Sequence, residues 1–208
     1  IDVAGFVIGW QAVVLAVSQE NSFLECLSLD ELVTLFGADA GIATWRAFGT
    51  SDSQGALAFF VSSAPDGGYE YFNEVVSGGE GTSFITQFLD DRTAIVNALV
   101  DNPGAVGLLT AVDYAANSDQ LRTLAIAGNS GTCVQPTRST IEDGSYEPLS
   151  RPLYLYFDVD GPANTPLIDA FLSYMLGTEG LSLFTEAVGY VSLTDDDIEA
   201  LRTRYDAP

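Results

Sequence analysis

Short apolar runs alternate along the chain with segments of helical periodicity. Val13–Val17 is a continuous apolar run rich in β-branched residues, which is typical of a strand buried on both faces. A helix is predicted over Leu29–Phe36, because Ser28 and Glu31 form a capping-box pattern and a glycine follows. Further strands are predicted at Ala56–Val61, Ala105–Leu109, Leu121–Ile126 and Pro152–Val159, and further helices at Tyr69–Val76, Asp91–Asn102, Val112–Asn117, Pro166–Leu176, Thr178–Ala187 and Asp195–Arg204. This alternation predicts an α/β fold with a mainly parallel sheet.

One segment has the order of strand, loop of small residues and helix. After the predicted strand Ala56–Val61, positions 62–68 are Ser-Ser-Ala-Pro-Asp-Gly-Gly, and the helix Tyr69–Val76 follows. A glycine-containing loop that leads into a helix gathers backbone N–H groups that can accept an anion. The loop is therefore a candidate anion site.

The composition and charge exclude several classes of function. The 208 residues include 29 acidic and 7 basic side chains, a formal net charge of −22, and all seven basic residues are arginine. Without histidine, the chain cannot build a Ser-His-Asp or Cys-His nucleophile system. With so few cations, binding to nucleic acid or to an anionic membrane surface is not expected. The 47% of hydrophobic residues are ample for a folded core.

Neither an enzyme nor a membrane span is predicted. The carboxylate pairs Asp90–Asp91 and Asp158 with Asp160 would suit glycoside hydrolysis, but so acidic a chain contains such pairs by chance. We therefore expect no catalytic residue, cofactor or metal. No apolar run reaches about 18 residues, the length that a spanning helix needs. The apolar stretch Val3–Val17 lacks a basic leading region, so it is predicted to belong to the mature structure, with any signal peptide already removed.

The two cysteines, Cys26 and Cys133, allow one disulfide. In an exported protein we would expect them to be paired, whereas in a cytosolic protein they would more often be buried thiols. Neither lies in a C-x-x-C pair, so zinc binding and dithiol redox chemistry are not indicated.

Five segments carry a resemblance to a known family. They are Ser22–Leu32 (SFLECLSLDEL), Trp45, Asn102–Gly107 (NPGAVG), Asp143–Tyr154 (DGSYEPLSRPLY) and Gly189–Leu193 (GYVSL). In this order they resemble the motifs of the substrate-binding proteins of phosphate ABC importers. The third and fourth segments are similar to the family's Pro-Gly-Ala and Tyr-x-Pro-Leu-Ser-Arg-Pro motifs.

The resemblance implies a type II periplasmic-binding-protein-like architecture of two α/β lobes with mainly parallel sheets. The ligand would lie in the cleft, and the chain would cross between the lobes twice. Residues 23–133 would form the second lobe, and residues 1–22 and 134–208 would form a partial first lobe. Cys26 and Cys133 would then lie at the two ends of the second lobe, where members of the family with both cysteines pair them. A disulfide and an extracytoplasmic location are therefore expected.

The first departure from the family concerns the first lobe. The family begins with three βα units of that lobe, whereas this sequence begins just before the first crossover strand. We therefore expect an incomplete first lobe with an exposed apolar face and open strand edges. A protein partner or a missing N-terminal segment is expected to complete it.

The second departure concerns the anion loop. The family's Ser-Gly-Thr triplet corresponds to Asp66-Gly67-Gly68, and its upstream arginine corresponds to Ser62. Asp66 is interpreted as the N-cap of the helix Tyr69–Val76, and an ionised Asp66 beside phosphate would oppose binding. Weak or absent phosphate binding is therefore predicted. The candidate ligand-binding residues are Ser62, Ser63, Asp66, Gly67, Gly68, Tyr69 and Arg151.

Arg151 has two interpretations within Ser150-Arg151-Pro152. It could be a cation of the cleft, or it could pair with a carboxylate and hold the second crossover in place, and we favour the structural role. The predicted function is capture of phosphate or a related oxyanion by an extracytoplasmic domain of an ABC import system. The alternative is a degenerate binding-protein fold that binds no ligand and serves as a structural or interaction subunit.

Overall fold

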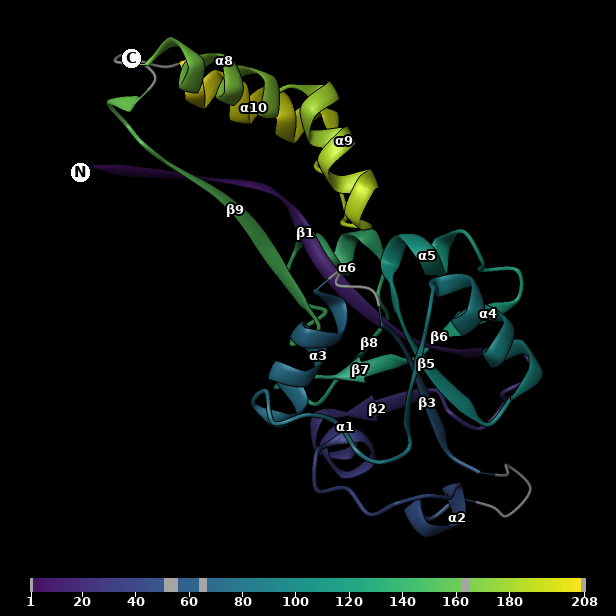
Figure 1. The fold of residues 1–208 in the computed structure, drawn as a ribbon. Helices are drawn as coiled ribbons and strands as arrows, with labels where there is room; N and C mark the ends of the chain where they lie inside the picture. Colours follow the sequence, from purple (N-terminus) through teal and green to yellow (C-terminus); the bar gives the residue numbers. More distant parts are fainter. Residues whose placement is uncertain (1, 51–55, 64–66, 162–164, 207–208) are drawn as a thin grey trace. The chain divides into compact units, whose positions relative to one another are not determined.

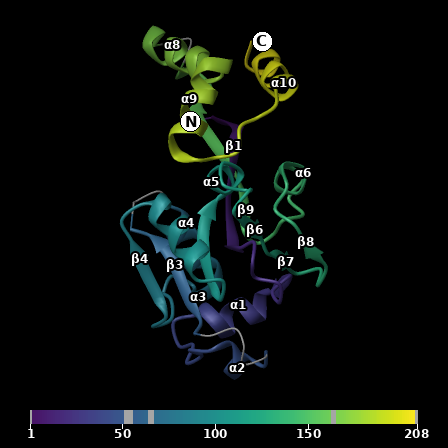
Figure 2. The same cartoon turned by 90° about the vertical axis from the view of Figure 1, so that its right-hand side faces the viewer.

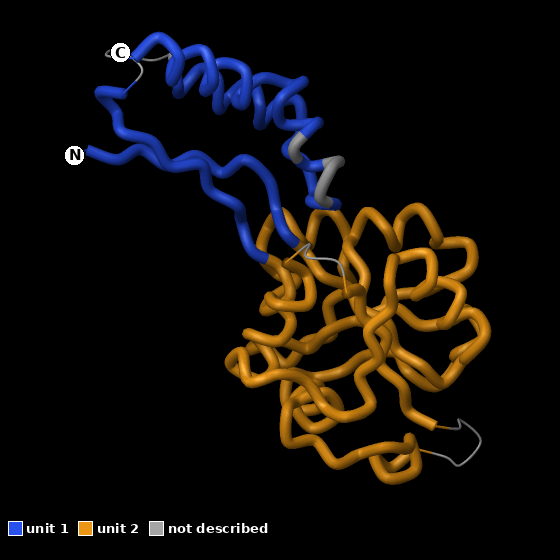
Figure 3. Tube along the Cα trace, viewed as in Figure 1, with its two compact units in different colours: residues 1–11, 151–208 blue, residues 12–150 orange. Residues whose placement is uncertain are grey.

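The computed structural model describes residues 2–50, 56–63, 67–161 and 165–206 (Figure 1). The chain forms two compact units, with residues 12–150 in unit 2 and residues 1–11 and 151–208 in unit 1 (Figure 3). Both boundaries fall within strands, β1 (Val3–Ser18) and β9 (Ser150–Asp158). The lobe boundaries implied by the resemblance, 1–22 with 134–208 and 23–133, stay a prediction.

Unit 2 contains the larger sheet. Its strand order is β4 (Thr86–Leu89), β3 (Ala58–Ser62), β5 (Ala105–Thr110), the second half of β1, and β6 (Leu121–Thr123). The strand β3 runs parallel to β4 and β5, whereas β1 is antiparallel to β5 and β6. All six residues of β5 are buried, because helices cover both faces of the sheet at this position.

Alternate side chains of β3 point to opposite faces of this sheet and meet different helices. The helices are α1 (Leu29–Phe36), α3 (Gly68–Ser77) and α4 (Arg92–Asp101). The Phe59 ring lies 4.4 Å from that of Phe36 and 5.2 Å from that of Phe72, measured between centroids. The neighbouring Phe60 belongs instead to a buried cluster that includes Ile95 and Leu99. Thus α1 and α3 cover one face and α4 covers the other, as Figure 1 shows.

A second, three-stranded sheet in unit 2 carries the disulfide. Its strands are β2 (Cys26–Ser28), β7 (Ala125–Ala127) and β8 (Cys133–Val134). Figure 2 shows β7 and β8 apart from β3 and β4. Cys26 and Cys133 are joined, with their Cα atoms 6.0 Å apart, so the predicted disulfide is confirmed. The shorter helices of unit 2 are α2 (Trp45–Phe48), α5 (Ala111–Ala115) and α6 (Arg138–Glu142).

Two of the motif residues have structural roles inside unit 2. Trp45 is fully buried, and its indole N–H donates to the carbonyl of Gly104 at 2.6 Å. Tyr146 is also fully buried, and its hydroxyl donates to the carbonyl of Val13 at 3.3 Å. Burial raises the pKa of Tyr146 far above that of a free tyrosine, so this phenol stays protonated. These side chains therefore belong to the core.

In the described residues, unit 1 contains a two-stranded ribbon followed by helices. The first half of β1 pairs with β9, and the helices are α8 (Pro166–Met175), α9 (Thr178–Val188) and α10 (Asp195–Asp206). The buried cluster of this unit includes Phe6 and Ile8 of β1, Leu181 of α9 and Leu201 of α10. One face of β9, represented by Phe157, packs against this cluster. Among the described residues, no helix has the length and apolar character that crossing a membrane requires.

The structure corrects three sequence predictions. The predicted strand Leu121–Ile126 is divided between the two sheets, because Leu124 N–H donates to Leu15 on β1 and Ala125 N–H donates to Glu25 beside β2. The strand predicted at Val13–Val17 begins ten residues earlier, at Val3. The helix α3 begins at Gly68 with Gly67 as its N-cap, so the prediction of Asp66 as the N-cap is wrong. Asp66 itself lies outside the described residues.

Candidate oxyanion site

The carboxyl ends of three parallel strands meet at one edge of the larger sheet. The strand β3 ends at Ser62, β4 at Leu89 and β5 at Thr110. The chain then enters α3, α4 and α5, respectively. Because α3 and α4 lie on opposite faces of the sheet, the two connections diverge there. In open α/β sheets, this is where ligands bind.

A small cavity of about 10 Å³ lies at this edge, entirely within unit 2. Its polar lining consists of Ser62, Gly68, Tyr69, Arg92 and Thr110, and its apolar lining consists of Val13, Leu108 and Leu109. Such a volume admits about one water-sized sphere. A tetrahedral oxyanion would therefore have to lie at the mouth of the cavity, with these groups forming one wall of its site.

Arg92 brings a positive charge to this edge. It is the first residue of α4, after the N-cap Asp91, whose carboxylate accepts from the Ala94 N–H at 2.8 Å. The Arg92 guanidinium lies 3.0 Å from a carboxylate oxygen of Asp113 on α5. The hydroxyl of Thr110 donates to the same carboxylate, and the Asp113 N–H donates to that hydroxyl at 3.1 Å. Asp113 therefore orients both the guanidinium and the hydroxyl.

The amino end of α3 adds the positive end of a helix dipole. Its N-cap Gly67 has a φ of 74°, a left-handed conformation that glycine adopts without strain. Since glycine has no side chain, the N-cap supplies no side-chain oxygen to the first-turn N–H groups. The ten residues of α3 direct a partial positive charge toward the edge where Arg92 lies.

The structure brings some of the predicted site residues together. Ser62, Gly68 and Tyr69 line the cavity, and Gly67 directly precedes Gly68. The Tyr69 hydroxyl lies 3.1 Å from the Thr82 hydroxyl, so the phenol already has a hydrogen-bond partner.

Two other predicted site residues, Ser63 and Arg151, do not join the cavity lining. Ser63 is exposed, and its N–H donates to the Leu89 carbonyl at 2.9 Å. Asp66 lies outside the described residues. Arg151 belongs to unit 1, where its Nε donates to Oε1 of buried Gln11 at 2.9 Å. This acceptor is an amide oxygen and not a carboxylate, so the predicted structural role of Arg151 stays a prediction.

Sequence reasoning missed Arg92, Thr110 and Asp113. Arg92 follows the edge strand β4, whose four residues alternate too weakly to predict a strand. Because the sequence does not predict β4 or its pairing with β3, it cannot place the start of α4 beside Ser62. The usable signal was the N-cap Asp91, which placed Arg92 in the first turn of a helix.

Comparisons with known proteins agree with this architecture. Residues 3–179 match the family model described as a PBP superfamily domain. The chain belongs to the PBP superfamily. It is 29% identical over 205 residues to phosphate-binding protein PstS of Staphylococcus haemolyticus, covering 97% of this chain and 62% of the relative. It is 26% identical over 200 residues to protein SphX of Synechococcus elongatus, covering 95% and 58%, respectively.

Solved structures of other proteins share the fold. A Planctomyces limnophilus structure, described as a possible phosphate binding protein, superimposes with a TM-score of 0.88 at 26% identity, covering 99% of this chain and 72% of that one. The ABC-type phosphate transport receptor of Vibrio cholerae gives 0.66 at 18% identity, covering 92% and 73%. The expected type II periplasmic-binding fold is thereby confirmed. The chain spans about three-fifths of the length of the curated relatives named above.

Proposed function

We propose that this chain is part of an extracytoplasmic binding protein that captures phosphate or a related small oxyanion for an ABC importer. The relatives named as phosphate-binding proteins support the ligand class. The V. cholerae receptor, named for ABC-type phosphate transport, supports the role. The observation that carries the proposal is the meeting of Arg92, Ser62 and the amino end of α3 at one strand edge.

The chemistry of this edge suits capture rather than catalysis. A guanidinium and helix N–H groups bind an oxyanion through charge-assisted hydrogen bonds. Binding of this kind needs no bond to break, so we propose a receptor and not an enzyme. The degenerate alternative is not favoured, because Arg92 provides a cation that the loop sequence alone does not reveal. The effect of Asp66 on affinity stays a prediction.

Replacing Arg92 by glutamine should weaken phosphate binding by about 10- to 150-fold, since one hydrogen bond to a charged group contributes roughly 1.5–3 kcal/mol. The measurement is calorimetric titration of the complete gene product with phosphate near neutral pH. Arg138→Gln is the matched control, because Arg138 pairs with Glu142 on α6 at 2.7 Å and does not line the cavity.

Two results would contradict the proposal at different levels. If the complete wild-type protein bound neither phosphate, arsenate nor sulfate at millimolar concentration, the receptor function would be refuted. If the wild-type protein bound phosphate and Arg92→Gln bound it equally well, the function would stand and this site would be wrong.

We also propose that additional polypeptide, in the same chain or in a partner, covers the apolar faces of unit 1. Of the fourteen exposed large apolar side chains among the described residues, nine lie in this unit. Leu167, Phe171 and Tyr174 are 79%, 52% and 49% exposed and form an i, i+4, i+7 stripe on α8. On the other face of β9 from the cluster, Tyr154 and Tyr156 stack with centroids 5.6 Å apart.

The 208-residue chain should therefore self-associate as its concentration rises, because uncovered apolar stripes and ribbon edges favour contacts between copies. The double variant Leu167→Gln with Phe171→Gln should shift association to concentrations about tenfold higher or more, given the free energy of burying such side chains. Sedimentation velocity measures this. A monomer at all concentrations for the unmodified chain would contradict the proposed covering.

A further inference from the structure

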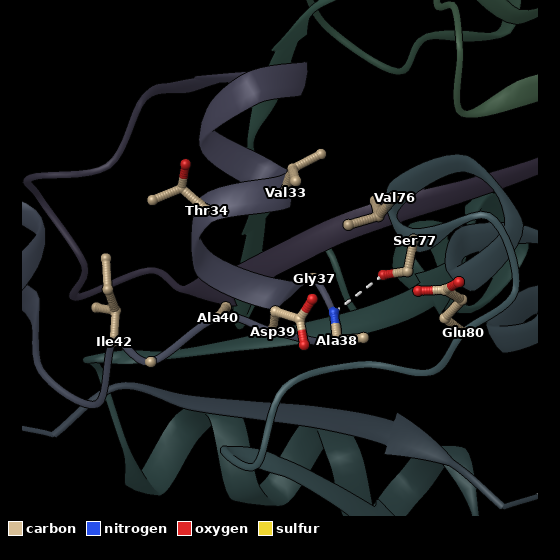
Figure 4. A pocket seen from close by; sticks show the side chains of 11 residues that line it. Val33, Thr34, Gly37, Ala38, Asp39, Ala40, Ile42, Val76, Ser77 and Glu80 are labelled. Carbon is tan, nitrogen blue, oxygen red and sulfur yellow. Dashed lines mark hydrogen bonds between the residues drawn. The ribbon is translucent and has the colours of Figure 1, made fainter.

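A groove of about 440 Å³ lies between the carboxyl ends of α1 and α3, within unit 2 (Figure 4). Val33, Ile42 and Val76 supply apolar surface, and Asp39, Ser77 and Glu80 supply polar groups. The Ala38 N–H donates to the Ser77 hydroxyl at 3.2 Å and ties the two sides together. The oxyanion site lies at the other end of α3, about 15 Å away for a ten-residue helix.

The charged groups around this groove are negative. Helix carboxyl ends carry partial negative charge, and neither α1 nor α3 has a basic residue in its last turn. Asp39 and Glu80 add two exposed carboxylates, for which the described residues offer no ion pair or side-chain hydrogen bond. None of the residues described along its wall is basic. The groove therefore favours a cation.

The apolar and exposed parts of the groove limit the kinds of ligand that it can bind. Val76 is buried and Val33 is 44% exposed, so apolar surface lies beside the carboxylates. Lysine and arginine lay an alkyl stem along apolar surface and keep the charged end at a polar edge. Asp39, Gly41 and Glu80 on the rim are exposed, so an occupant would stay partly in water. A small-molecule site would instead bury most of its ligand.

We propose that this groove docks a segment of a partner protein that presents a lysine or arginine beside apolar residues. The proposal does not depend on oxyanion binding, because it uses neither Arg92 nor the amino end of α3. A segment of this chemistry would match the groove in charge and in apolar surface, and charge complementarity favours specificity and faster association.

The test uses the complete protein with labelled methyl groups and three peptide probes at low salt: acetyl-Leu-Lys-Leu-amide, the Leu-Gln-Leu analogue and the Leu-Glu-Leu analogue. The lysine peptide should shift the methyl resonances of Val33, Ile42 and Val76, and the other two peptides should shift them little. Asp39→Asn with Glu80→Gln should weaken the lysine peptide by about 2- to 30-fold, as expected for two partly exposed ion pairs.

The matched control is Asp101→Asn with Asp119→Asn, which changes the net charge equally at exposed acids outside the groove. Its affinity for the lysine peptide should equal that of the wild-type protein. Equal weakening in both double variants would show that only the overall charge matters and would overturn the proposal. Equal affinities for the three peptides would also overturn the proposal. So would equal affinities for n-butylammonium and the lysine peptide, because the apolar residues beside the cation would then contribute nothing. Circular dichroism verifies that each variant is folded.

Discussion

Alanine in place of Trp45 should lower the free energy of unfolding by about 3–5 kcal/mol, the cost of removing a large aromatic side chain from a close-packed core. Trp45 is fully buried, with its ring 5.2 Å from that of Phe23 between centroids. Its indole N–H also donates to the Gly104 carbonyl, which would lose this partner. Urea unfolding, with the slope of the transition compared between variants, measures the change.

Two companion variants separate the contributions. Trp45→Phe keeps much of the apolar volume and removes the indole N–H, so it should destabilise less than alanine does. Phe84→Ala removes an aromatic side chain that is 69% exposed and should change the free energy of unfolding by less than about 1 kcal/mol. If Trp45→Ala were as mild as Phe84→Ala, the role of this motif residue in the core would be wrong.

Elements with strong local signals could be predicted from the sequence. The helix α1 was predicted with its correct bounds, because Ser28 and Glu31 form the capping box that the structure shows. The strand β5 was predicted within one residue, since all six of its residues are buried and every one before Thr110 lacks a polar side chain. In both cases local chemistry and tertiary packing favour the same conformation.

Elements that depend on distant partners could not be predicted. The strand β4 is a four-residue edge strand held by pairing with β3, and its own pattern carries little signal. The division of residues 121–127 between two sheets depends on Leu15 and Glu25, which lie about a hundred residues earlier in the sequence. No local periodicity reports which strand a segment will pair with.

The same limit explains the candidate site. The loop after β3 was found because strand, small residues and helix follow one another directly in the sequence. Arg92 and Thr110 reach that loop only through the parallel order β4-β3-β5, so their proximity to Ser62 is a product of topology. The loop sequence alone predicts weak binding, because it does not show that Arg92 lies at the same strand edge.

The disulfide is expected to contribute strongly to the stability of unit 2. Cys26 and Cys133 are separated by 107 residues, and the residues between them include the whole β4-β3-β5 region of the larger sheet. In the chain-entropy model, a cross-link around a loop of about 100 residues disfavours the unfolded state by about 4.7 kcal/mol. In the folded state, the two cysteines are also brought together by the sheet itself, since their strands β2 and β8 both flank β7.

Replacing Cys26 and Cys133 together by serine should therefore lower the free energy of unfolding by about 2–5 kcal/mol, the usual range for loss of a native disulfide. Cys133 is exposed and Cys26 is partly exposed, so the serine hydroxyls remain hydrated and add little cost of their own. Urea unfolding with and without reductant provides the control: reductant should bring the wild-type protein to the stability of the variant and leave the variant unchanged. Equal stability of the oxidised wild-type protein and the variant would contradict this prediction, because the cross-link would then constrain nothing that unfolding releases.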